Sequence, residues 1–159
     1  MTTVTTSRPL AAILVGGLIA GVLDLTVALT WGALKGVKPI LIMQSIASGW
    51  EGLTAFQGGW RSAALGVALH FLIAITAAAV FYVLSRKLTF LVRHAVLSGL
   101  LYGIAIYFFM TYVVVANSAF PIKGGRFNLT NFIASNLTHM FCVGLPIALA
   151  TRRYSLVRP

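Results

Sequence analysis

Long apolar runs, separated by short polar segments, are the main pattern along the chain. Four of them lie at residues 10–30, 62–84, 95–115 and 129–150. Each is about 20 residues long, the length that crosses the hydrocarbon core of a bilayer as a helix. The strands of a membrane barrel would instead alternate in segments of about ten residues. The pattern therefore predicts an all-α, integral membrane four-helix bundle that occupies residues 1–159 as a single transmembrane domain.

A shorter segment at residues 39–50 lies between the first two runs, on the side of the membrane that we take as outer. It opens with Pro39, a favoured first residue of a helix, and is too short to cross a bilayer. We expect an amphipathic outer helix that either lies in the interface or dips into the membrane as a re-entrant segment. Its apolar positions at helical spacing are Ile40, Met43, Ala47 and Trp50. This spacing predicts that Gln44 and Ser48 face water.

The composition agrees with a membrane location. Hydrophobic residues make up 59% of the chain and charged residues only 9%, whereas soluble domains carry about 25% charged residues. Disorder requires low hydrophobicity and is excluded by the same figures. No phosphate-binding loop, paired-cysteine zinc motif or other soluble-enzyme signature is present. We therefore do not expect an enzyme.

The basic residues are grouped between the apolar runs. Twelve Lys and Arg face two acids, for a net charge of +10. Seven lie on the side of the termini: Arg8, Arg86, Lys87, Arg93, Arg152, Arg153 and Arg158. Five lie on the other side: Lys35, Lys38, Arg61, Lys123 and Arg126. This distribution is typical of topology determinants that contact anionic headgroups, not of nucleic-acid binding, and it favours both termini in the cytoplasm.

Two pairs of glycines are spaced for close helix packing. They are Gly17 with Gly21 in the first run, and Gly99 with Gly103 in the third. Small residues four apart let helix backbones approach closely. Each pair precedes a run that carries one histidine, His70 or His139, which is the pattern of two parallel helix pairs in a weak internal repeat.

Three ionisable residues lie within the apolar runs: Asp24, His70 and His139. Burying such groups in a bilayer is costly, so they usually face the bundle interior and have partners. Counting about 1.5 Å per residue puts all three roughly 10–15 Å below the outer interface. We therefore expect one intramembrane polar cluster, with Tyr107 of the third run supplying a hydroxyl at a similar depth. A proton-linked cluster is favoured over a metal site, because no further carboxylate in the bilayer would orient the histidines.

Four short segments carry a resemblance to a known group of proteins: residues 21–24, 44–49, 69–71 and 139–146. Their sequences are GVLD, QSIASG, LHF and HMFCVGLP. Together they resemble an uncharacterised family of small four-span bacterial inner-membrane proteins, over nearly the whole chain. The resemblance implies a multi-pass protein of the bacterial inner (cytoplasmic) membrane, and it implies no activity.

These observations favour a small, non-enzymatic, polytopic membrane protein that performs proton-linked transport or ion conduction. A chain of 17.0 kDa has little interior, so we expect it to act as a homo-oligomer or within a larger membrane complex. Two alternatives stay open: an accessory or assembly subunit of a larger complex, and a haem- or quinone-binding subunit that uses His70 and His139. Outside that last alternative no cofactor is expected.

Overall fold

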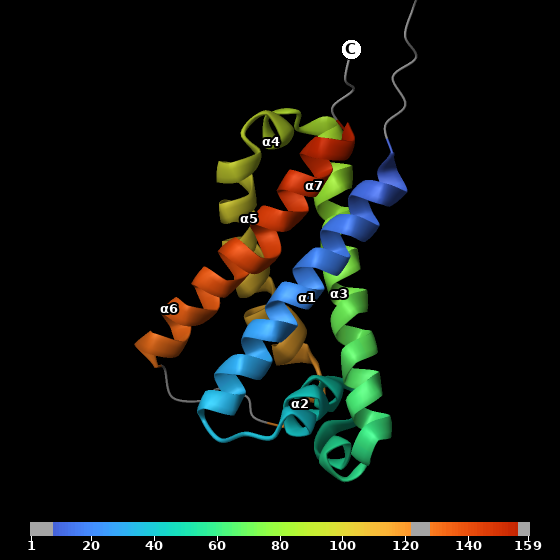
Figure 1. Cartoon of the computed structure of the whole chain (residues 1–159), viewed down its shortest axis with the longest axis vertical. Helices are drawn as coiled ribbons and strands as arrows, with labels where there is room; N and C mark the ends of the chain where they lie inside the picture. The colour runs from blue at the N-terminus through green and yellow to red at the C-terminus, as the bar shows by residue number, and fades with distance from the viewer. Residues whose placement is uncertain (1–7, 122–127, 156–159) are drawn as a thin grey trace, which may run out of the picture.

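The computed structural model describes residues 8–121 and 128–155, and in these residues it contains helices and no strands. Four helices are long and apolar enough to cross a membrane: Pro9–Leu34, Gly59–Lys87, Ala95–Val115 and Leu129–Ser155. The first two are α1 and α3, and the third is α5 (Ala95–Phe109) continued by η2 (Met110–Val115). The fourth consists of α6 (Leu129–Thr138), η3 (His139–Gly144) and α7 (Leu145–Ser155). This architecture confirms the predicted all-α helical bundle and fits a multi-pass membrane protein (Figure 1).

The two ends of the described chain meet at one end of the bundle. The backbone N–H of Arg8 donates to the carbonyl of Tyr154 at 3.2 Å, and α4 (Phe90–Arg93) lies at the same end (Figure 1). The basic side chains described at this end are Arg8, Arg86, Lys87, Arg93, Arg152 and Arg153. Those described at the other end are Lys35, Lys38 and Arg61, while Lys123, Arg126 and Arg158 lie outside the described residues.

A tightly packed core fills the half of the bundle nearest the termini. It consists of Ala20, Ala77, Ala78, Phe81, Ala95, Val143, Ile147 and Ala148. The many alanines let the helices approach closely. The Tyr102 hydroxyl donates to the Ala77 carbonyl at 2.8 Å, and its ring lies edge-on to that of Phe81 at 4.9 Å. These contacts fasten α5 to α3 in this half.

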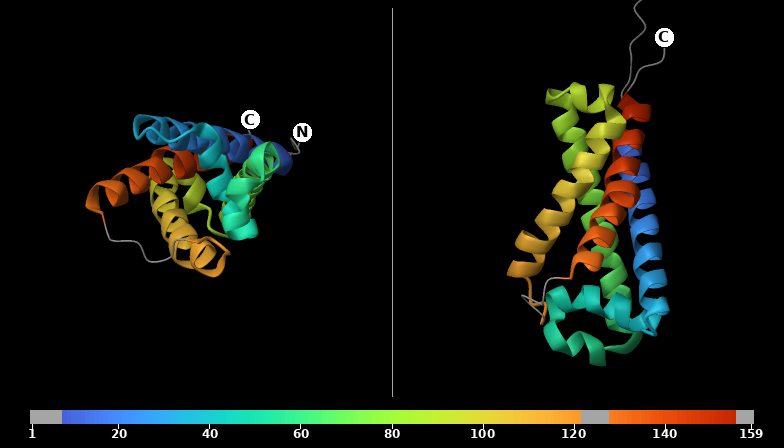
Figure 2. Two further views of the ribbon diagram at one scale, coloured as in Figure 1. Left: turned by 90° about the horizontal axis from the view of Figure 1, so that it is seen from below. Right: turned by 90° about the vertical axis from the view of Figure 1, so that its left-hand side faces the viewer.

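Beyond that core the helices diverge. α1 packs against α3 and α7, and α5 packs against η3 and α7. Figure 2 shows that α5 and η2 lean away from α3 towards the other end of the bundle. The short helix α2 (Pro39–Glu51) lies across this wider end and packs against α3. The membrane-spanning part is therefore compact at one end and open at the other.

The glycines at 17 and 21 lie where α1 is closest to α3. A Cβ added to Gly17 would lie 2.7 Å from the Cα of Ile75, and one added to Gly21 would lie 2.7 Å from the ring of Phe71. The first of these neighbours is backbone and cannot move aside. Only glycine permits this helix spacing at position 17.

The glycines at 99 and 103 have the same relation to the fourth span. A Cβ on Gly99 would lie 2.9 Å from the carbonyl oxygen of Gly144, and one on Gly103 would collide with the carbonyl oxygen of His139. Each of the two glycine pairs thus faces the following long helix at close range.

Two stretches of π-helix interrupt the spans, and the sequence indicated only one irregularity. The sequence predicts a kink at Pro146, which lacks the N–H that would bond to the Cys142 carbonyl. The structure places the π-helix η3 immediately before this proline. The second π-helix, η2, contains no proline, so the sequence does not indicate it.

Helix α2 forms where a helix was expected, but its buried face differs from the expectation. Gln44 is 2% exposed and Ser48 is fully buried, so the prediction that both face water is wrong. The Gln44 side-chain amide donates to the Gly59 carbonyl at 2.9 Å, and the Ser48 hydroxyl donates to the Ser45 carbonyl at 2.7 Å. The periodicity rule failed here because the neighbour of α2 is the polar backbone at the start of α3.

Candidate functional site

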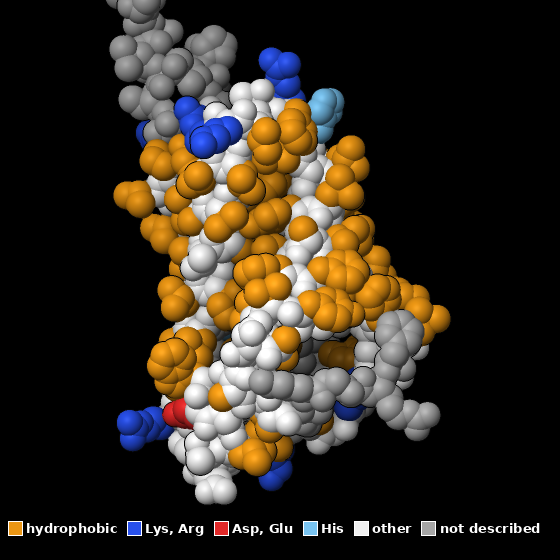
Figure 3. Space-filling view, turned by 180° about the vertical axis from the view of Figure 1, so that it is seen from behind, with side chains coloured by type: hydrophobic (Ala, Val, Ile, Leu, Met, Phe, Trp, Pro, Cys, Tyr) orange, Lys and Arg blue, Asp and Glu red, His pale blue; other side chains and the backbone are white. Residues whose placement is uncertain are grey.

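A cavity of about 410 Å³ lies where the helices diverge. Its wall is formed by α1, α2, α3, the end of α5, both π-helices and the segment that follows η2. The core around Ala77 closes it towards the termini, and α2 lies at its opposite end. The space-filling view shows the molecule hollowed in this region, with apolar side chains inside (Figure 3). A broad apolar surface lies between the charged ends of the molecule in the same view.

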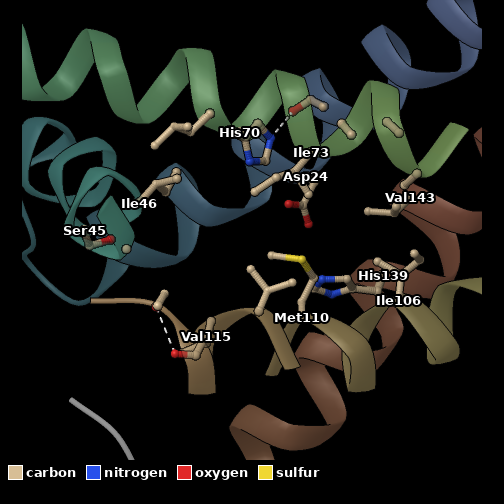
Figure 4. A pocket seen from close by; sticks show the side chains of 18 of the residues that line it. Asp24, Ser45, Ile46, His70, Ile73, Ile106, Met110, Val115, His139 and Val143 are labelled. Atoms are coloured by element: carbon tan, nitrogen blue, oxygen red, sulfur yellow. Dashed lines mark hydrogen bonds between the residues drawn. The ribbon is translucent and has the colours of Figure 1, made fainter. Parts of the chain in front are cut away.

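Asp24, His70 and His139 all line this cavity, from α1, α3 and η3 respectively. Figure 4 shows the Asp24 side chain directed into the space between the two imidazole rings. The structure therefore brings together the three groups that helical arithmetic placed at one depth. Tyr107 is not part of the wall; its ring packs edge-on against that of His139, with 5.6 Å between centroids.

Each histidine donates one ring N–H to a backbone carbonyl. Nε2 of His70 lies 2.9 Å from the carbonyl oxygen of Gly21, and Nδ1 of His139 lies 2.8 Å from that of Ser135. A carbonyl can only accept, so these two nitrogens carry the hydrogen. In the neutral rings, Nδ1 of His70 and Nε2 of His139 then have free lone pairs. Either nitrogen can accept a proton or a hydrogen bond from a ligand.

The hydroxyl groups of two serines of the wall also donate to backbone carbonyls. The Ser45 hydroxyl donates to the Ile42 carbonyl at 2.7 Å, and the Ser118 hydroxyl donates to the Val115 carbonyl at 2.8 Å. Ser118 also accepts from the Phe120 N–H at 3.2 Å. No pattern in the sequence indicates Ser118, which follows the third span and lies beside the end of α2, where the Ala119 N–H donates to the Gly49 carbonyl at 2.9 Å.

The Asp24 carboxylate is the single acidic group of the wall, and no Lys or Arg of residues 8–121 and 128–155 lines the cavity. Among the described residues Asp24 has no hydrogen-bond or ion-pair partner. Most of the remaining wall is apolar, including Leu69, Ile73 and Val143. A carboxylate in such surroundings is costly unless it binds a proton or a cation.

The polar groups do not form a metal centre. Within residues 8–121 and 128–155, no group of three or more His, Cys, Asp or Glu side chains could hold a metal ion. A haem held by two histidines would also fit poorly. A metal-bound imidazole donates its other N–H to a carbonyl or carboxylate, an arrangement that leaves Nε2 of His139 free but occupies Nε2 of His70. Haem ligation through both Nε2 atoms would require the His70 ring to turn.

The fold and the cavity together fit a multi-pass membrane protein with an internal polar site. No family model, curated protein or solved structure matches the chain.

Proposed function

We propose that this protein is a proton-linked membrane transporter and that the cavity is its binding site. The observation that carries the proposal is the convergence of Asp24, His70 and His139 on one cavity from three separate helices. Intramembrane ionisable groups mark ion pathways and proton relays in membrane proteins. We place the protein in a bacterial inner membrane, with both termini in the cytoplasm.

The state of each polar group supports proton exchange. Asp24 has no protein partner among the described residues, so it is free to bind a proton or a cation. His70 and His139 each keep one nitrogen unbonded, because the other nitrogen is held by a carbonyl. Fixed imidazoles with one free nitrogen are suited to accept and release protons.

An accessory or assembly subunit is supported less well by this arrangement. Apolar helix faces and glycine contacts would be enough for such a role, and a carboxylate in an apolar cavity adds only a cost. We retain the homo-oligomer as part of the proposal, since a chain of 17.0 kDa has little interior for a pathway. Native mass spectrometry of gently solubilised protein tests this part by reporting the number of copies and any larger partner.

Proton movement into vesicles tests the main proposal. Purified protein is reconstituted into liposomes that contain a pH-sensitive dye, and a potassium gradient with valinomycin drives protons inward. We expect flux in the native protein and none above empty vesicles in Asp24→Asn. Glu51→Gln is the matched control, because Glu51 is the other acid and lies outside the cavity wall. Equal flux in the native protein and Asp24→Asn, or none in either, would contradict the proposal.

A further inference from the structure

We propose that the ligand of the cavity is a small protonated amine with an apolar body. This inference rests on the proposed function, since it names the substrate class of the same site. It depends on the direction of the hydrogen bonds around the cavity, which determines whether the wall offers donors or acceptors to a ligand.

The wall offers mainly acceptors. The four polar side chains other than Asp24 and Trp50 each donate their hydrogen to a backbone carbonyl; they are Ser45, His70, Ser118 and His139. Neutral imidazoles then present a lone pair, hydroxyl oxygens retain acceptor capacity, and a carboxylate such as that of Asp24 is acceptor-only when it is ionised. Trp50 keeps its indole N–H, but it is 77% exposed and therefore lies at the edge of the cavity. A ligand that donates hydrogen bonds is complementary to such a wall.

The charge of the wall selects a cation. Asp24 is its one acidic residue, and the lining side chains that the structure describes include no Lys or Arg. In an apolar environment an attractive charge pair is stronger than in water, and a like-charged ligand would be repelled and lose its hydration. An anion therefore meets no cationic side chain among the described lining residues, whereas a monovalent cation neutralises Asp24.

The apolar remainder of the wall distinguishes an organic cation from an inorganic one. A metal cation needs a shell of oxygen ligands to replace its water, and the described residues supply no such cluster. Ile73, Met110 and Phe120 instead offer apolar surface to the body of a ligand. The volume of about 410 Å³ lies within the range of cavities that bind small molecules.

Acceptors also distinguish between classes of organic cation. A primary ammonium group has three N–H donors to share among Asp24, His70 and His139, whereas a quaternary ammonium group has none. If charge alone governed binding, the two classes would bind equally well. The arrangement of lone pairs predicts that the primary amine binds more tightly.

A ligand series on purified protein tests the inference. Isothermal titration at about pH 8, where imidazoles are mostly neutral, compares 2-phenylethylamine, its N,N,N-trimethyl derivative and phenylacetate. We expect the primary amine to bind at least tenfold more tightly than the quaternary derivative, and no binding of phenylacetate. Asp24→Asn should weaken binding of the amine at least tenfold, while Glu51→Gln leaves it unchanged. Circular dichroism and size-exclusion chromatography establish that both variants are folded.

The outcomes separate this inference from the proposed function. Equal binding of the primary and quaternary amines would overturn the donor argument, and binding of phenylacetate would overturn the charge argument. Both comparisons use the native protein, so they hold even if Asp24→Asn fails to fold. If no amine binds but proton flux still depends on Asp24, the substrate class is wrong and the proposed function stands. If amine binding depends on Asp24 and flux does not, the proton-linked transport is wrong.

Discussion

His70 and His139 hold opposite tautomers within the same cavity. His70 donates through Nε2 and His139 through Nδ1, each to a helix carbonyl. Nitrogen-15 NMR of histidine-labelled protein with neutral imidazoles should therefore show one ring protonated at Nε2 and another protonated at Nδ1. His70→Gln should remove the first pattern and His139→Gln the second.

The third histidine is the control for this measurement. His94 is exposed at the end of the bundle near the termini and forms no part of the cavity wall. Its ring should exchange between tautomers in water, and His94→Gln should leave both other patterns in place. The same tautomer at His70 and His139 would contradict the assigned hydrogen bonds.

Counting residues along regular helices predicted a common depth for Asp24, His70 and His139, and the structure places all three on the wall of one cavity. The same counting did not predict the orientation of Tyr107, whose ring packs on His139 and does not line the cavity. Depth follows from the rise of a helix, whereas direction depends on how neighbouring helices are rotated, which the sequence alone does not specify.

At the scale of elements, the contact between α2 and α3 depends on Gly66. A Cβ at this position would collide with the Met43 carbonyl and would lie 3.1 Å from the Ala47 backbone nitrogen. Both neighbours are backbone, so the helices must separate. Gly66→Ala should cost about 1–3 kcal/mol of folding free energy, measured as a lower midpoint of thermal unfolding in detergent.

Gly49, which lies in α2, provides the matched control. A Cβ there would meet its nearest atoms, those of Ser118, at 3.8 Å, which is ordinary contact. Gly49→Ala should therefore leave the midpoint unchanged or raise it, since alanine favours a helix by up to about 1 kcal/mol over glycine. A loss of stability as large as that of Gly66→Ala would contradict the close approach of α2 and α3.

The buried polar face of α2 gives a second prediction for this element. Cys142 is the single cysteine, so Cys142→Ser supplies a cysteine-free background. Cysteines introduced at Gln44 and Ser48 should resist a water-soluble maleimide, because these positions are 2% and 0% exposed. A cysteine at Trp50, 77% exposed, should react. Fast labelling at position 44 or 48 would contradict the burial of these residues and would support the water-facing orientation that the apolar periodicity predicts.

The start of α2 was predictable because Pro39 is a strong start signal. The helix ends at Glu51, one residue beyond the predicted end, where Gly52 with φ of 63° adopts a conformation that favours glycine. Its orientation was not predictable. Apolar periodicity indicates a face that avoids water, but Gln44 can also avoid water by donating to the Gly59 carbonyl. The polar surface of a neighbouring helix end is invisible in the sequence of α2.

At the scale of the whole molecule, the charges at the two ends predict its orientation. Among the described residues the end with the termini carries six basic side chains and no acid, and the other end carries three together with Glu51. The positive-inside rule then predicts that the termini lie in the cytoplasm. A green fluorescent protein fused to the C-terminus should fluoresce, and alkaline phosphatase fused there should be inactive. Active phosphatase at this position would reverse the topology.

The number of long apolar helices followed from run lengths, since each apolar run must satisfy its own backbone inside lipid. The helices extend up to five residues beyond the predicted runs, as at Ser155 after the predicted end at residue 150. The divergence of α5 and η2 from α3 did not follow. It arises from contacts between distant segments, such as Ala119 N–H to the Gly49 carbonyl at 2.9 Å, which ties the chain after η2 to the end of α2. The cavity exists because of this divergence. The sequence therefore predicted that Asp24, His70 and His139 belong together, but it did not predict the cavity between them.

The hydrogen bond from Tyr102 to Ala77 has a mechanical consequence. It fastens α5 to α3 at the narrow end of the cavity, while Val115 lies 13 residues further along, about 20 Å away at the rise of a helix. The helix between these two residues is held at its Tyr102 end, beside the alanine-rich core. A tilt of only about 10° at Tyr102 would displace Val115 by about 3.5 Å, and the hydrogen bond from the Ala119 N–H to the Gly49 carbonyl opposes such a tilt at the far end. The width of the cavity mouth therefore depends on one backbone hydrogen bond beyond Val115, whereas the core around Tyr102 is held by its own contacts.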